Sequence, residues 1–197
     1  MYPTKMEANG HIYNINTDYR IALACLRAID DDEITNLERY LAIEGLLLGY
    51  NVDNDDRGIL QNKIATYLRC GKEENTSIEE IDFDYLQDEQ DVRTSIRQAY
   101  SMDLNKIDYL HWWEYNELIS GLLPDSLINR IRETRNLDEK DYKDPKDKER
   151  IRKQKEHVAL KKKTKKVELT DEQMKNIEDF YRLRREGRSW FLCLKIN

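Results

Sequence analysis

The spacing of apolar residues predicts helices over most of the first 70 positions. The apolar residues of the first such segment recur at the three- and four-residue spacing of one helix face: Tyr19, Ala22, Leu23, Leu26 and Ile29. Asn16 or Thr17 is the expected N-cap of this helix, since short polar side chains accept the free backbone N–H groups there. Similar patterns predict helices within 34–48 and 59–71, and Ile59 falls on the apolar face of the second of these.

A short hairpin is predicted ahead of these helices. Asn9 and Gly10 lie between two extended runs, and this residue pair is typical of two-residue hairpin turns because both positions need a positive φ. The hairpin and the helices together form a predicted N-terminal region, residues 1–71. Residues 72–82 have many charges and no periodicity, so they are predicted to be a connecting loop.

A central helical region is predicted over residues 83–137, with Asn105 as the expected cap of its second helix. The stretch YLHWWEYNELISGLLPDSLINRIRETR, at 109–135, has apolar residues on two sides of the helix, so it must be covered on more than one side. Pro124 ends this helix and a short helix follows. We expect this region to form one body with residues 1–71.

The adjacent tryptophans Trp112 and Trp113 are notable because the chain has only three. Neighbouring helical residues point about 100° apart, so one ring can fill the core while the other faces a neighbouring element. Alternatively, one of them anchors a partner protein, since Trp, Tyr and Arg dominate interface hot spots. Stacking on nucleic-acid bases is the least supported reading, because the main basic run begins about thirty residues later.

The chain changes character after residue 137. Asp144 followed by Pro145 is typical of a helix start, and residues 144–186 are predicted to form a charged helical arm. Its apolar stripe is thin and buries too little surface to offset the ordering entropy alone, which is typical of an arm that needs a partner. Residues 187–197 are abruptly apolar and are predicted to dock on another surface.

Composition supports a helical fold. Charged residues make up 37% of the 197-residue chain, against about 25% in an average domain, and there are only 7 Gly and 3 Pro. Such a composition favours long solvated helices over a turn-rich β fold. The predicted fold class is therefore mainly α, with an N-terminal β-hairpin, a compact helical body and a charged C-terminal helical arm.

Charge is segregated along the chain, although the net charge is only −6. Residues 1–91 hold 20 acidic and 8 basic side chains, whereas 146–166 hold 11 basic and 3 acidic ones. The basic run could neutralise phosphates, but the acidic total and the lack of a known nucleic-acid module favour a solvated helix face. The candidate cations for ionic contacts with a partner are Lys153, Lys161, Lys162 and Lys163.

Nothing in the chain predicts catalysis, a metal site or a cofactor. Phosphate-loop, dinucleotide, zinc-protease and serine-hydrolase motifs are missing, and the three histidines lie far apart. Cys25, Cys70 and Cys193 lack zinc-ligand spacing and are expected to be reduced thiols. The acidic residues within 53–56 lack the terminal glutamate of a calcium loop, so a solvated turn is expected. With no signal peptide or membrane span predicted, the cytoplasm is the expected compartment.

Several stretches resemble a known family of phage proteins. LHWWEYNELISGLLPDS, INRIRETRNLD and KERIRKQKEHVAL are similar to segments of small bacteriophage proteins encoded beside the tail tape-measure gene in long-tailed phages of Gram-positive hosts. The hairpin with INTDYR, YLRCGKEE at 67–74 and FDYLQDEQDV at 83–92 extend this resemblance over roughly residues 3–160. The two residues before Arg135 depart from the family pattern, and residues 161–197 lie beyond it.

The resemblance implies a helical, non-catalytic tail assembly chaperone that acts in the host cytoplasm and is not expected in the mature virion. The implied partners are the tape measure protein and the tail tube protein, with a second copy or a companion chaperone as further partners. The candidate partner-binding residues are Trp112, Trp113, Tyr115, Leu122, Arg132 and Arg135. Two alternatives stay open: a nucleic-acid-associated regulatory or packaging factor acting through 146–166, and a structural tail component.

Overall fold

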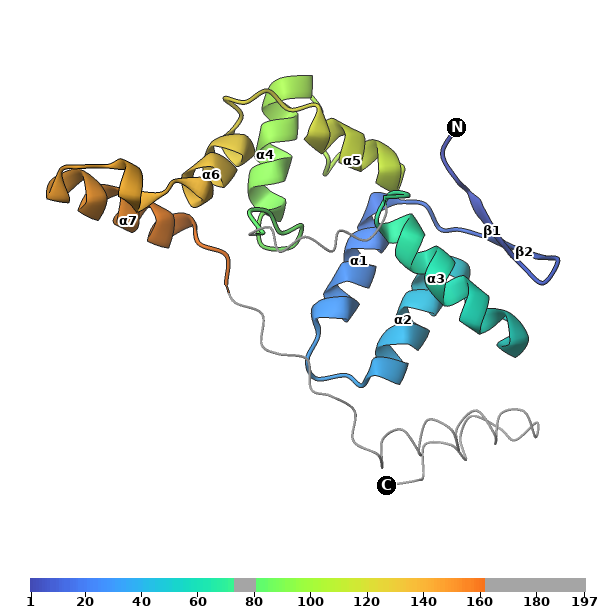
Figure 1. Cartoon of the computed structure of the whole chain (residues 1–197). Helices are drawn as coiled ribbons and strands as arrows, with labels where there is room; N and C mark the ends of the chain where they lie inside the picture. The colour runs from blue at the N-terminus through green and yellow to red at the C-terminus, as the bar shows by residue number, and fades with distance from the viewer. Residues whose placement is uncertain (73–80, 162–197) are drawn as a thin grey trace.

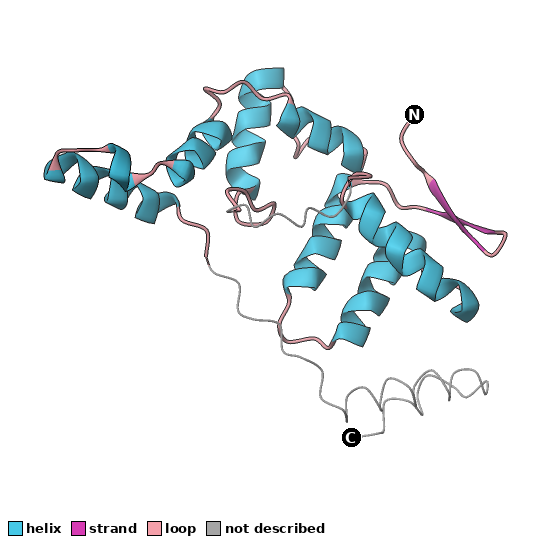
Figure 2. Cartoon of the chain, viewed as in Figure 1, coloured by secondary structure: helices cyan, strands magenta, loops and turns pink. Residues whose placement is uncertain are grey.

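The computed structural model describes residues 1–72 and 81–161, which form a mainly helical fold with an N-terminal hairpin, as predicted (Figure 1 and Figure 2). The described elements, in chain order, are β1 (Lys5–Ala8), β2 (His11–Asn14), α1 (Tyr19–Asp30), α2 (Asn36–Leu48), η1 (Asn54–Asp56), α3 (Arg57–Leu68), α4 (Glu89–Tyr100), α5 (Trp112–Ser120), α6 (Leu127–Asn136), η2 (Glu139–Asp141) and α7 (Pro145–Val158). Residues 162–186 of the predicted arm and the predicted docking segment 187–197 lie outside the described residues.

The hairpin forms because its two turn residues adopt the required backbone angles. Asn9 and Gly10 have φ angles of 48° and 83°. The strands pair antiparallel, with Ala8 opposite His11. Met6 and Ala8 are buried while Lys5 and Glu7 are exposed, so one face of β1 packs on α3. The predicted turn is confirmed.

A short backbone bridge joins the segments that precede α1 and α5. Asp18 and His111 form an isolated antiparallel bridge. Beside it, the N–H of Trp112 donates to the carbonyl of Thr17 at 2.8 Å. The bridge fixes the first turn of α5 against the first turn of α1, although the two helices lie about ninety residues apart in the sequence.

The bridging residues also cap the two helices, which corrects two predictions. The side chains of Asp18 and His111 each accept the backbone N–H two positions further on, at 2.9 and 3.0 Å. The predicted caps were Asn16 or Thr17 for α1 and Asn105 for α5. They lie too early because residues 17 and 18 and residue 111 form the extended bridge directly before each helix.

An ion pair that apolar spacing does not reveal joins α2 to α3. Glu44 and Arg57 are only 2% and 6% exposed, and Arg57 Nη2 lies 2.8 Å from Glu44 Oε1. On α3, Leu60 and Ile64 are buried as their spacing predicts. Ile59 is 39% exposed, so its predicted place on the apolar face of α3 is wrong.

The helices form two groups around one core. The hairpin and α1 to α3 lie on one side, and α4 to α6 lie on the other (Figure 1). Helix α1 contacts both α2 and α5, and α4 contacts both α5 and α6. The buried apolar side chains form a single cluster that includes residues from Met6 in β1 to Ile128 in α6.

Helix α7 packs on α6. Asp144 caps α7 and Pro145 occupies its first turn, as predicted. Ile151 is 4% exposed, and the side chain of Arg135 donates from Nε to the carbonyl of Val158 at 2.6 Å. The first part of the predicted arm therefore lies against the helical body.

Candidate partner-binding surface

The two adjacent tryptophans begin α5 and enter different surroundings. Trp112 is 0% exposed, and its Nε1 donates to the carbonyl of Leu68 at 3.0 Å. Trp113 is half-buried, and its Nε1 donates to the carbonyl of Tyr67 at 3.0 Å. A helix leaves its last carbonyls without partners inside the helix, and both tryptophans donate to carbonyls at the end of α3. The Tyr67 carbonyl also accepts the N–H of Cys70 at 2.9 Å.

Trp113 borders the hairpin side of the molecule. Its ring lies over Gly71, where φ is 75° and an added Cβ would meet Trp113 Cη2 at 3.1 Å. The left-handed backbone favours glycine there, and an added Cβ would crowd the ring. On the hairpin side, Trp113, Met6 and Tyr67 are among the residues that line a hollow of about 310 Å³.

Trp112 belongs to a buried aromatic cluster. Its ring centroid lies 5.2 Å from that of Tyr85 and 5.8 Å from that of Tyr115. Tyr115 and Leu122 are 1% and 6% exposed. Of the four apolar residues predicted to bind a partner, Trp112, Tyr115 and Leu122 are therefore core residues in this conformation, and only Trp113 reaches the surface.

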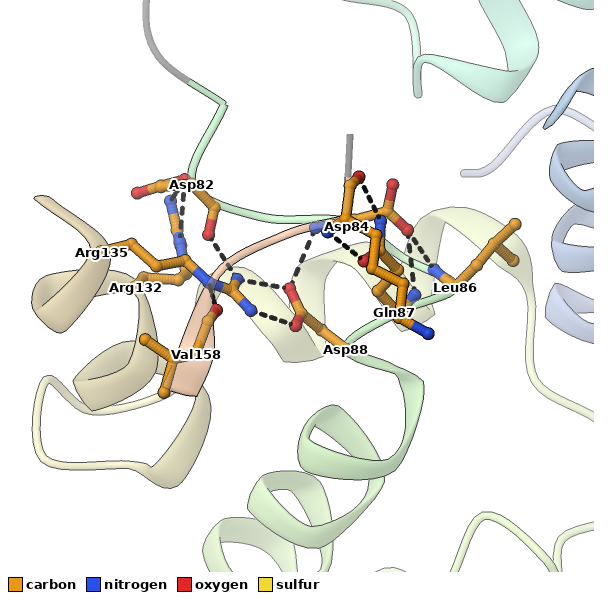
Figure 3. Close-up of polar contacts among 9 residues, drawn as sticks. Asp82, Asp84, Leu86, Gln87, Asp88, Arg132, Arg135 and Val158 are labelled. Carbon is orange, nitrogen blue, oxygen red and sulfur yellow. Dashed lines mark hydrogen bonds and ion pairs between the residues drawn. The ribbon is translucent and has the colours of Figure 1, made fainter. Parts of the chain in front are cut away.

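Arg135 is the centre of a network that fixes the segment before α4 (Figure 3). It forms a bidentate pair with Asp88, at 2.8 Å from Nη1 and 2.7 Å from Nη2. Nη1 also donates to the carbonyl of Asp82 at 2.7 Å. The hydrogen bonds from Arg135 to Asp88 raise the pKa of the guanidinium. Since the pair is only 12% and 3% exposed, it is a buried interaction, and Arg135 has little surface to offer a partner.

Arg132 supports the same segment from one turn earlier on α6. Its guanidinium donates to Asp82 Oδ1 at 3.2 Å and lies 5.8 Å from the ring centroid of Phe83. Asn136 donates to the other carboxylate oxygen of Asp82 at 2.9 Å. Partial burial raises the pKa of Asp82, but the hydrogen bonds from Asn136 and Arg132 leave it below its ordinary value.

The segment from Asp84 to Asp88 is also hydrogen-bonded within itself (Figure 3) and to Lys161, which follows α7. Asp84 Oδ1 accepts the N–H groups of Leu86 and Gln87 at 2.9 and 3.0 Å, and the N–H of Asp84 donates to Asp88 Oδ2 at 3.0 Å. The Gln87 side-chain oxygen accepts the N–H of Lys161 at 2.8 Å. These bonds give the segment one fixed path.

This fixed segment forms one wall of a groove with a volume of about 530 Å³, and the last turn of α1 and the residues after α7 form the others. Most of the lining is apolar, with carboxylates at Asp30 and Asp84. Ile81 is 80% exposed at its edge. We call this the α1 groove, and it is lined by Leu26, Ile29, Asp30, Ile81, Phe83, Asp84, Tyr85, Leu86, Gln87, Leu160 and Lys161.

Three of the predicted partner residues support the groove wall without lining the groove themselves. Trp112 packs on the groove residue Tyr85, and Arg135 and Arg132 hold the wall through Asp88 and Asp82. Of the lining residues, Lys161 is one of the candidate cations predicted from the sequence, and the others are not among the predicted site residues. Several of the others lie in FDYLQDEQDV, a stretch that carries part of the family resemblance.

The candidate cations lie on and after α7. Lys153 is exposed and pairs with Glu149, with Nζ 3.3 Å from Oε1. Lys161 is exposed at the α1 groove. Lys162 and Lys163 lie outside the described residues. Several cations of α7 therefore already have a carboxylate neighbour three or four positions away, as for Arg150 and Asp147 at 3.1 Å.

The acidic residues within 53–56 were expected to form a solvated turn, but Asp56 is only 1% exposed, so this prediction is wrong for Asp56. Its carboxylate accepts hydrogen bonds from Asn9 Nδ2 at 2.8 Å and from the Tyr13 hydroxyl at 2.5 Å, and His11 Nδ1 lies 2.8 Å away. All three donors come from the hairpin and its turn. Asp56 therefore fastens the hairpin to the start of α3.

Residues 1–72 and 81–161 hold no cluster of three or more His, Cys, Asp or Glu side chains suited to a metal ion. Burial raises the pKa of the Cys25 thiol to about 12 and that of the Cys70 thiol to about 11. Both thiols are free. No helix within these same ranges has the length and apolar character needed to cross a bilayer.

A family model described as Bacteriophage Gp15 protein matches residues 2–160. This match covers most of the 197-residue chain, so the protein belongs to that bacteriophage family. Comparisons with curated proteins and with solved structures found no match. The matched region ends at Leu160, which lines the α1 groove together with the next residue, Lys161.

Proposed function

We propose that this protein is a tail assembly chaperone that binds an apolar segment of the tape measure protein in the host cytoplasm and leaves before the virion is complete. Membership of a bacteriophage family supports a role in the phage life cycle. The observation that carries the proposal is the α1 groove, which is mostly apolar and is walled by a segment that a buried ion pair holds in place. Ile81 is exposed at this groove.

The proposed mechanism is physical and requires no catalysis. A tape measure is a long, largely apolar helical chain, and its exposed stripes would associate with one another in water. Each large apolar side chain moved from water into a groove contributes about 1.5–3 kcal/mol, so a few side chains give useful affinity. Because the groove wall is already ordered, binding costs little further conformational entropy.

Trp112, Tyr115 and Leu122 are partner-binding candidates in the sequence, but they are buried in the structure. We therefore assign partner binding to the α1 groove. Tail tube protein, a second copy or a companion chaperone would meet the charged face of α7, where Lys153 and its neighbours are exposed. Ionic contacts of this kind affect association rate and specificity more than affinity.

Co-expression with the neighbouring tape-measure and tube genes tests the proposal. We expect the tape measure to stay soluble and to copurify with this protein. Ile81→Asp places a charge in the groove and should reduce the copurified tape measure at least several-fold. Tyr50→Asp is the matched control, because Tyr50 is 82% exposed outside the groove. A tape measure that stays soluble without this protein would remove the chaperone role.

The two alternatives have separate tests. A nucleic-acid-associated factor should bind arbitrary DNA or RNA with an affinity that falls steeply with salt, and replacing Lys161, Lys162 and Lys163 by Gln should abolish that binding. The pairing of α7 cations with neighbouring carboxylates gives this alternative less support. A structural tail component should appear in purified virions by mass spectrometry, whereas the proposed chaperone should be missing from them.

A further inference from the structure

The α1 groove lies where the described chain ends. Leu160 and Lys161 line it, and Lys161 is held there by its backbone bond to the Gln87 side chain. In the 197-residue chain, 36 residues follow Lys161. These residues therefore leave directly from the edge of an apolar groove, and they lie beyond the matched family region, which ends at residue 160.

The residues after Leu160 have two distinct compositions. Residues 161–166, KKKTKK, hold five lysines. Residues 190–197, WFLCLKIN, hold six apolar residues in eight. Water disfavours a cluster of exposed apolar side chains as dense as this one, so the final segment needs a surface to cover it.

Charge favours a path back toward α1. The last turn of α1 and the turn after it carry Asp30, Asp31, Asp32 and Glu33 in succession. Asp30 and Lys161 line the same groove, so the five lysines begin beside this acidic turn. Five residues beyond Lys161 reach about 17 Å when extended, which is long enough for the basic run to follow the acidic turn.

The length of the remaining chain permits a return to the groove. Thr170 followed by Gln173 is typical of a capping box, so within the predicted arm the sequence predicts a helix over residues 170–186, which would be about 25 Å long. The linkers on either side of it, residues 162–169 and 187–189, can together span up to about 37 Å. Tethering also gives the final segment an effective concentration in the millimolar range, so a weak apolar contact suffices to keep it bound.

We propose that the apolar segment 190–197 folds back and occupies the α1 groove of its own chain, while the basic run 161–166 follows the acidic turn after α1. The protein thus carries an internal ligand for its own groove. This inference does not rest on the tail assembly role, because its test uses this chain in isolation. A tape-measure segment that binds the same groove would displace residues 190–197.

Fluorine NMR of the full chain tests this contact. The chain has three tryptophans, so labelling with 5-fluorotryptophan gives three signals, and Trp190→Phe assigns the signal of Trp190. A labelled peptide of residues 187–197 supplies the position of the free state. In the full chain we expect the Trp190 signal at a distinct position that does not change on dilution from about 200 to about 5 µM, since intramolecular binding is independent of concentration.

Two surface variants locate the contact. Ile81→Asp should shift the Trp190 signal toward the free-peptide position, whereas Tyr50→Asp should leave it unchanged. Ile81 and Tyr50 are 80% and 82% exposed, so neither change should disturb folding, and unchanged Trp112 and Trp113 signals verify this. The proposal is overturned if the Trp190 signal coincides with the free peptide, if dilution moves it as for a second copy, or if Ile81→Asp leaves it in place.

Discussion

Two regions of this protein each combine a buried carboxylate with one of the adjacent tryptophans, and they use them differently. In the hairpin region, Asp56 accepts hydrogen bonds from Asn9 and Tyr13 and lies beside His11, and Trp113 borders a hollow that Met6 of β1 also lines. All of these side chains except Asp56 and Trp113 belong to the hairpin and its turn.

In the groove region, Asp88 is 2% exposed and pairs with the guanidinium of Arg135, and Trp112 packs on the groove residue Tyr85. The groove region thus depends on a permanent cation. The hairpin carboxylate instead depends on neutral hydroxyl and amide donors and on one imidazole that titrates.

Because their buried carboxylates have different partners, the hairpin region and the groove region should respond to different perturbations. A buried carboxylate that loses its only cation is left with an uncompensated charge, which is among the largest single effects in a folded protein. A carboxylate with several neutral donors loses only part of its solvation when one donor is removed. The groove region should therefore be sensitive to single substitutions, and the hairpin region to pH.

Breaking the Arg135–Asp88 pair should have the largest effect. Arg135→Ala leaves Asp88 buried without its cation and should lower the free energy of unfolding by about 3–5 kcal/mol. Chemical denaturation measures this change. Arg130→Ala is the matched control, because Arg130 is exposed on the same helix, and it should change stability by no more than about 0.5 kcal/mol. Equal effects of the two variants would show that the pair does not hold the groove wall.

Substituting each tryptophan should also distinguish the groove region from the hairpin region. Trp112→Ala removes a side chain that is 0% exposed and should cost about 3–5 kcal/mol, with loss of order in the groove wall through Tyr85. Trp113→Ala removes a half-buried ring and should cost about 1–2 kcal/mol while the protein stays folded. Hydrogen exchange should show faster exchange around residue 85 only in Trp112→Ala. Faster exchange around residue 85 in both variants would contradict the expectation that only Trp112 supports the groove wall.

The hairpin region should lose stability as pH rises above neutrality. The hydrogen bond and the negative charge of Asp56 raise the pKa of His11 above its ordinary value of 6.5. The contribution of the charged imidazole is therefore fully present below about pH 6.5 and is lost as pH rises through the higher folded-state pKa. Thermal unfolding between about pH 6 and 9 measures the decline, which should be smaller than either of the preceding effects because His11 is half exposed.

Matched histidine variants locate this pH dependence. His11→Gln should flatten the profile over the same range, whereas His157→Gln, on the exposed surface of α7, should retain it. At the acidic end, the hydrogen bond from Tyr13 is the main cause that lowers the pKa of Asp56. Its contribution is present above its ordinary value of 3.8 and is lost as pH falls through the lower folded-state pKa. A decline that persists in His11→Gln would assign the pH dependence to another group.

The sequence predicts the elements of this fold better than it predicts the groove. The Asn9-Gly10 turn and the Asp144-Pro145 helix start are local signals, because neighbouring residues set their backbone angles, and both are confirmed. The caps of α1 and α5 were missed because a bridge between residues 18 and 111 determines them. The groove joins segments from α1, residues 81–87 and residues 160–161, and only tertiary contacts bring these together.

The smallest effect should come from the exposed ion pairs of α7. Lys153 pairs with Glu149 at 3.3 Å, but their side chains are 70% and 43% exposed. Water screens such pairs, and holding two long side chains together costs entropy, so Lys153→Gln should change the free energy of unfolding by no more than about 0.5 kcal/mol. Chemical denaturation at low and high salt measures this change. A loss approaching that of Arg135→Ala would mean that α7 is held by its charged surface, whereas we expect Ile151 and the Arg135 contact to Val158 to hold it.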